Sequence, residues 1–144
     1  MRADLHSHSS CSDSTRAPAE VVRRAAAAGL DAIALTDHDT IAGIEPATAA
    51  LPPGLSLIPG MELSCRRDGH SVHLLAYLFD PAGQELACEC EAIRTSRVQR
   101  ARAMVAKLNE LGVPVTWETV RAIAGDGVIG RPHIARAMVQ AGAI

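Results

Sequence analysis

Residues 17–36, APAEVVRRAAAAGLDAIALT, contain a predicted helix followed at once by a predicted buried strand. Pro18 suits the first turn of the helix, Glu20 complements the positive end of its dipole, and Gly29 suits its end. The run at residues 31–36 is short, apolar and flanked by turn signals, which is typical of a buried strand. A helix directly before such a strand is the repeating unit of an α/β fold.

The rest of the first half extends this alternation. We expect a short strand at residues 2–6, a broken helix at 41–51, and two further strands at 55–65 and 70–79. Strands that alternate with helices predict a largely parallel sheet. Active sites in such sheets lie at the carboxyl ends of the strands.

Beyond about residue 82 the pattern becomes helical. A long amphipathic helix is expected at residues 93–112, and shorter helices at 116–125, with Thr116 as its N-cap, and at 131–142. The apolar stripe of the long helix is predicted to be Val98, Ala101, Val105, Leu108 and Leu111, with Arg94, Arg97, Arg100 and Lys107 outside it.

Composition excludes several classes of partner. A net charge of −2 gives no electrostatic footprint for long duplex nucleic acid or for an anionic membrane. No run of about 18 apolar residues is present, and the N-terminus lacks the apolar region of a secretory signal. The spacing of the four cysteines matches no zinc or redox pattern, so reduced thiols and a cytoplasmic location are expected.

Histidine and acidic residues collect near the ends of the predicted strands. In DLHSHSSCSD, residues 4–13, the imidazoles of His6 and His8 are two positions apart and should face the same side of a strand, with Asp13 in the following loop. The next three predicted strands contribute His38 within TDHD, Glu62 within PGMELS, and His73.

Each of these residues has an ordinary explanation by itself, as a surface turn, a solvated strand end or a core histidine. Their joint position at strand ends is what favours a metal site. Mixed imidazole and carboxylate ligands suit Zn²⁺, Mn²⁺ or Fe²⁺, whereas Ca²⁺ prefers oxygen ligands alone.

A second candidate site is GVIGRPHIARAM, residues 127–138. Pro132 can take the first helical position with Arg131 at the cap, which places Arg131 and His133 at a helix N-terminus, where anions are attracted. The planar guanidinium fits phosphate. The alternative interpretation is an ordinary exposed helix start.

Four segments, DLHSHS, TDHD, PGMELS and HSVHLLAY, occur in the order typical of the PHP (polymerase and histidinol phosphatase) family, which this sequence resembles. The segment GRPHIARAM resembles a subgroup of small metal-dependent phosphoesterases that includes nucleoside 3′,5′-bisphosphate phosphatases and RNA-trimming exonucleases. The resemblance implies a distorted (β/α)7 TIM-like barrel that holds up to three divalent ions, Mn, Fe or Zn.

The resemblance also implies roles for individual residues. For the metals, it assigns His6 and His8 to the first ion, Glu62 to a bridge between the first and second, His73 to the second, and Asp13 and His38 to the third. For the remaining candidates, it assigns Asp37 and Asp39 to orienting the imidazoles, and Arg131 and His133 to contacting phosphate or substrate.

The resemblance further predicts the organisation of the chain. Residues 1–81 would form the N-terminal half of the barrel, and residues 82–144 a helical insertion after the fourth strand. Family members are longer and carry further ligands, so this chain is expected to end before the rest of the barrel.

The implied activity is hydrolysis of a phosphate monoester by metal-activated water. The substrate would be a small phosphorylated compound, such as a nucleoside 3′,5′-bisphosphate or a short oligonucleotide. The alternatives that remain open are a 3′–5′ exonuclease, a histidinol-phosphatase-like enzyme, or an inactive metal-binding fragment.

Overall fold

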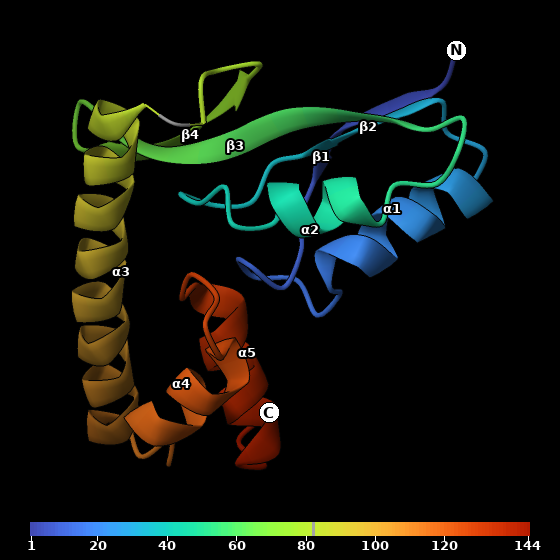
Figure 1. Cartoon of the computed structure of the whole chain (residues 1–144). Helices are drawn as coiled ribbons and strands as arrows, with labels where there is room; N and C mark the ends of the chain where they lie inside the picture. The colour runs from blue at the N-terminus through green and yellow to red at the C-terminus, as the bar shows by residue number, and fades with distance from the viewer. Residues whose placement is uncertain (82) are drawn as a thin grey trace.

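The computed structural model of the chain describes residues 1–81 and 83–144 and has a mixed α/β fold (Figure 1). Its elements are, in chain order, β1 (Ala3–Ser7), α1 (Pro18–Ala27), β2 (Ala32–Leu35), α2 (Ile44–Ala49), β3 (Ser56–Arg67), β4 (His70–Tyr77), α3 (Gln84–Glu110), α4 (Trp117–Ala124) and α5 (Arg131–Gln140).

The described sheet has the strand order β1-β2-β3-β4, so each strand lies beside its neighbour in sequence. The pairs β1–β2 and β2–β3 are parallel, and β3–β4 is an antiparallel hairpin. The Tyr77 hydroxyl of β4 donates a hydrogen bond to the Leu5 carbonyl of β1 at 2.7 Å, which joins the two outer strands. The sheet is therefore curled, as in half of a barrel.

Helices α1 and α2 lie on one face of the sheet and cover it (Figure 1). All four residues of β2 are buried, which explains the uninterrupted apolar run from which this strand was predicted. The core between helices and sheet consists of Val22, Ala25, Ile33, Leu35, Ala47 and Leu55.

A second core lies among α3, α4 and α5. It consists of Ala101, Val105, Val115, Val120, Ala124, Ile129, Ile134 and Ala137. The N-cap prediction for α4 is confirmed, because the Thr119 backbone N–H donates to the Thr116 hydroxyl at 3.1 Å. Gly130, rather than Arg131, is the N-cap of α5.

Three details of α3 differ from the prediction. The helix begins at Gln84 rather than at residue 93. Its first turns are largely exposed, and their few part-buried apolar residues, Leu86, Cys90 and Ile93, are interspersed with acidic ones. Leu111 is 68% exposed beyond the helix end, so it is not part of the core. Arg97, predicted to lie outside the stripe, is buried.

The helical segment contacts the loop that follows β1. The Val128 N–H donates to the Cys11 carbonyl at 3.0 Å, and a Cβ placed on Gly127 would lie 2.6 Å from the Ser10 carbonyl oxygen. Only glycine allows this approach. The predicted boundary between the two parts at residue 82 falls on a residue outside the described ranges.

Candidate metal centre

The six residues predicted as metal ligands lie together, and we call them the metal-site cluster: His6, His8, Asp13, His38, Glu62 and His73. His6 lies on β1, and His8 and Asp13 lie in the loop that follows it. His38 follows β2 and forms an isolated parallel bridge with Glu62 of β3. Four strands therefore position the cluster. His6, His8, Asp13 and His38 lie at or just beyond the carboxyl ends of the parallel strands β1 and β2, as expected. Glu62 and His73 instead lie within the antiparallel hairpin of β3 and β4.

Glu62 is the centre of the cluster. Its Oε2 lies 2.8 Å from His6 Nε2 and 3.1 Å from His8 Nε2, and its Oε1 contacts His73 Nδ1. The carboxylate is 5% exposed, so these imidazoles surround it almost completely. One buried carboxylate with three imidazoles is suited to bridge two cations.

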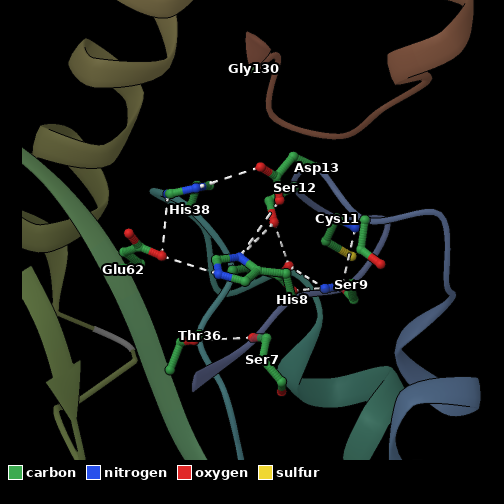
Figure 2. A network of polar contacts seen from close by, with 12 residues as sticks. Ser7, His8, Ser9, Cys11, Ser12, Asp13, Thr36, His38, Glu62 and Gly130 are labelled. Carbon is green, nitrogen blue, oxygen red and sulfur yellow. Dashed lines mark hydrogen bonds and ion pairs between the residues drawn. The ribbon is translucent and has the colours of Figure 1, made fainter. Parts of the chain in front are cut away.

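The other side of the cluster is organised around Asp13. Figure 2 shows Asp13 near both His8 and His38, with a dashed line that joins it to His38. Asp13 Oδ1 lies 3.7 Å from His8 Nδ1, and Oδ2 lies 3.6 Å from His38 Nε2. The His8 and His38 rings are 4.8 Å apart between centroids. These distances exceed hydrogen bonds and leave room for a shared ion.

The ligand atoms form three overlapping groups within which all lie within 4.8 Å of one another. The groups are His6–His8–Glu62, His8–Asp13–His38 and His38–Glu62–His73. His8, His38 and Glu62 each belong to two groups. Such sharing is what a cluster of neighbouring cations requires.

The environment of His38 supports metal binding. Its Nδ1 is buried and has no hydrogen-bond partner among the described residues, and the nearest carboxylate oxygen, on Glu62, is 3.7 Å away. A buried imidazole nitrogen without a partner is costly unless it ligates something. Burial, and then the positive charge of Arg97, lower the pKa of His38, which keeps the ring neutral as a ligand must be.

Glu62 is held in its anionic form. Burial alone would raise its pKa, but the hydrogen bonds from His6 and His73 outweigh burial and lower it. Imidazole nitrogens around an ionised carboxylate are the donor set that Zn²⁺, Mn²⁺ and Fe²⁺ accept. The residues present therefore fit divalent metal ions.

Asp37 supports the loop that carries His8. Its carboxylate accepts hydrogen bonds from the Ser9 N–H at 2.7 Å, the Ser9 hydroxyl at 2.6 Å and the Ser12 hydroxyl at 2.6 Å. Ser12 Oγ in turn lies 3.5 Å from His8 Nδ1. Within residues 1–81 and 83–144, Asp37 thus reaches an imidazole only through Ser12. A Cβ on Gly43 would lie 2.7 Å from Asp37 Oδ2, so this network needs a glycine there.

Asp39 connects the site to α3. It has a φ of 52°, and its carboxylate accepts hydrogen bonds from the Ser64 N–H at 2.7 Å, the Ser64 hydroxyl at 2.8 Å and Arg97 Nε at 2.6 Å. Its hydrogen-bond partners in the described chain include no imidazole. The burial of Arg97 was not predicted, although its spacing was consistent with it: Arg97, Ala101 and Val105 are spaced by four and share one helix face.

Arg131 and His133 begin α5 beside the metal-site cluster. A Cβ on Gly130 would lie 3.7 Å from the Asp13 Cβ. Arg131 is exposed, whereas His133 is 2% exposed and its Nδ1 accepts a hydrogen bond from the Gly130 N–H at 2.9 Å. Burial, and then the charge of Arg136, lower the pKa of His133. Its ring holds the first turn of α5 in place.

Comparison with known proteins gives consistent matches. Residues 4–115 match the pattern of the PHP domain. The chain is 39% identical over 142 residues to a 5′-3′ exoribonuclease of Haemophilus influenzae, covering 98% of this chain and 52% of that protein. It is also 39% identical over 143 residues to a 3′,5′-nucleoside bisphosphate phosphatase of Chromobacterium violaceum, covering 98% and 50%.

A solved structure from Bifidobacterium adolescentis, provisionally assigned as a metal-dependent phosphoesterase, superposes with a TM-score of 0.93 at 37% identity and covers 100% of this chain and 51% of that one. The chain spans about half the length of the relatives it matches. None of the helices in the described ranges has the length and apolar character needed to cross a bilayer.

Proposed function

The chain belongs to the PHP domain family, and from this premise we propose that it carries part of the active site of a metal-dependent phosphoesterase. The substrate is a small phosphate monoester, and a nucleotide such as a nucleoside 3′,5′-bisphosphate is the best candidate. The observation that carries this proposal is the convergence of six imidazole and carboxylate side chains into three overlapping groups, in which the buried His38 Nδ1 has no hydrogen-bond partner among the residues that the structure describes.

The three groups would hold up to three divalent ions, with Glu62, His8 and His38 each shared between two groups. Bound ions supply charge neutralisation of the phosphoryl oxygens and activation of a water. Manganese, iron and zinc all suit the donor set.

The other residues would position the substrate. Arg131, exposed at the start of α5 beside Asp13, would bind phosphoryl oxygens through its planar fork. His133, buried behind the first turn of α5, would hold Arg131 in place. Asp37 would keep His8 oriented through Ser12, and Asp39 would fix the end of β2 against α3.

A second candidate function is removal of nucleotides from RNA, supported by the relative named as an exoribonuclease. The name of that relative gives the 5′-3′ direction, whereas the alternative predicted from the sequence was a 3′–5′ exonuclease. The cytoplasm remains the proposed location, because all four cysteines are free thiols.

The test is metal content together with turnover. Protein reconstituted with Mn²⁺ is assayed by elemental analysis and with p-nitrophenyl phosphate, nucleoside bisphosphates and short RNA. His8→Ala should weaken metal affinity by at least about 10-fold, because loss of a group that only orients a ligand already costs about 10–100-fold. His70→Ala is the matched control, since His70 is exposed on β4 and lies outside the three groups. Equal metal content in wild type and His8→Ala would remove the proposed site.

A further inference from the structure

A cleft lies between α3 on one side and α4 with the loop that follows it on the other, and we call it the α3–α4 cleft. Its volume is about 460 Å³, within the range of small-molecule sites. The described residues that line it include no member of the metal-site cluster. On α3 it is lined by one row of the helix, in which Arg94, Val98 and Arg102 are four residues apart. Arg100 lies about 200° around the helix from Val98 and lines a different cavity.

The α3–α4 cleft has a stacking surface for a planar ring. The Arg102 guanidinium lies over the Trp117 ring, 4.5 Å from its centroid. Trp117 is the single tryptophan of the chain and is only partly buried at the start of α4. Nucleobases stack on aromatic side chains and on guanidinium planes, and each stacked base increases affinity roughly 5–150-fold. The stacked pair lines the cleft and therefore offers such a surface to a ligand.

The α3–α4 cleft also carries net positive charge. Its charged residues are Glu91, Arg94, Arg102, Arg121 and Asp126. In the part of the chain that the structure describes, Arg94 pairs with Glu91 at 3.7 Å, whereas neither Arg102 nor Arg121 forms an ion pair with a carboxylate. A guanidinium without a counter-ion can bind two oxygens of a phosphate through its planar fork. Asp126 is exposed and can accept hydrogen bonds from hydroxyl groups.

The walls of the α3–α4 cleft are held in place without a ligand. Arg121 Nη1 donates a hydrogen bond to the Gly125 carbonyl at 2.5 Å, which uses one of its five N–H groups and orients the rest. On the loop side Val128 and Ile129 are buried, and the Val128 N–H donates to the Cys11 carbonyl at 3.0 Å. Because these groups are already ordered, binding costs less conformational entropy.

We propose that the α3–α4 cleft binds a nucleotide at a site separate from the metal centre. The base stacks on the Arg102–Trp117 pair, Arg121 binds the phosphate, and Asp126 accepts hydrogen bonds from the ribose hydroxyls. A free mononucleotide and one nucleotide of an RNA strand both carry this chemistry, and the experiment distinguishes them. The proposal goes beyond the proposed function, because it uses no metal ion and no residue of the metal-site cluster.

The experiment measures binding of adenosine 5′-monophosphate after metal has been removed with EDTA, by Trp117 fluorescence and by calorimetry at fixed ionic strength. The nucleotide should change the fluorescence saturably. Adenosine and inorganic phosphate should each bind at least about 10-fold more weakly, because each keeps only part of the contacts. Arg102→Gln and Arg121→Gln should each weaken nucleotide binding at least about 10-fold. Both side chains are exposed, so the variants should fold, and Arg100→Gln on the other side of α3 is the matched control that should bind like the wild type.

The proposal is overturned if the fluorescence shows no saturable change, or if both cleft variants keep the wild-type affinity. It is also overturned if binding is lost in Arg100→Gln and kept in Arg121→Gln, because the nucleotide would then lie in the other cavity. Tetraadenylate identifies the source of the ligand: binding at least about 10-fold tighter than that of the monophosphate indicates an RNA strand, and equal binding indicates a free mononucleotide. Since metal is absent throughout, either outcome leaves the test of the metal centre independent.

Discussion

Replacing Arg97 by Met should destabilise the chain through the carboxylate it leaves behind. Asp39 is fully buried, and the side chain of Arg97 is 7% exposed, so removing the guanidinium leaves a buried charge without its cation. Breaking such a pair costs about 3–5 kcal/mol. The two hydrogen bonds from Ser64 remain, and Met retains the packing of the alkyl stem, so we expect about 3 kcal/mol. That corresponds to a fall in Tm of roughly 6–12 °C.

The assay is urea unfolding followed by the fluorescence of Trp117, the single tryptophan. The control is the double variant Asp39→Asn with Arg97→Met, in which neither partner is charged. It should be more stable than Arg97→Met, because replacing both members of a buried pair avoids an isolated charge. The reasoning is refuted if Arg97→Met costs less than about 1 kcal/mol, or if the double variant is no more stable than the single one.

Three other predictions concern the site and its supports. Gly43→Ala should cost about 1–3 kcal/mol in unfolding free energy, because the new Cβ would lie 2.7 Å from Asp37 Oδ2 and 2.9 Å from Leu35 Cδ2; an unchanged Tm would contradict the packing. The free energy of unfolding should fall as the pH drops below about 6.5, by at most about 1.4 kcal/mol per pH unit for each of His38 and His133. Burial keeps both rings neutral in the folded chain, whereas both take up a proton in the unfolded chain. His133→Gln should reduce this dependence on pH. The prediction is contradicted if urea titrations at pH 5.5 and 7.5 give the same difference in unfolding free energy for His133→Gln as for the wild type. Mn²⁺ at 100-fold its Kd should stabilise the chain by about 2.7 kcal/mol, and identical melting curves with Mn²⁺ and with EDTA would exclude specific binding.

The order of the elements could be predicted because it depends on local patterns. Each signal specifies the structure of residues close to it in the sequence. Examples are the apolar run of β2, Gly29 at the end of α1, and Thr116 as the N-cap of α4. The gathering of His6, His8, Asp13 and His38 followed from one general rule, that the carboxyl ends of neighbouring parallel strands meet at one edge. Glu62 and His73 lie inside the antiparallel β3–β4 hairpin, which that rule does not describe.

What could not be predicted depends on partners distant in sequence. The burial of Arg97 required knowing that Asp39, 58 residues earlier, would meet it. The spacing of Arg97 from Ala101 and Val105 matched the buried face of α3, but a charged residue in a helix normally indicates the exposed face, so its charge led to the wrong side. The burial of His133 likewise depends on the loop after β1, which lies far away in the sequence. The residues around Pro132 give no indication of that contact.

The position of each ligand within the sheet has a consequence for how metal would be lost. The side chains of His6 and His73, on the outer strands β1 and β4 of the described sheet, are 50% and 41% exposed, whereas those of His38 and Glu62 are 11% and 6% exposed. Outer strands open at lower free energy than central ones. Dissociation should therefore be stepwise, with ions that depend on His6 or His73 leaving for a chelator first and the ion between His8, Asp13 and His38 leaving last.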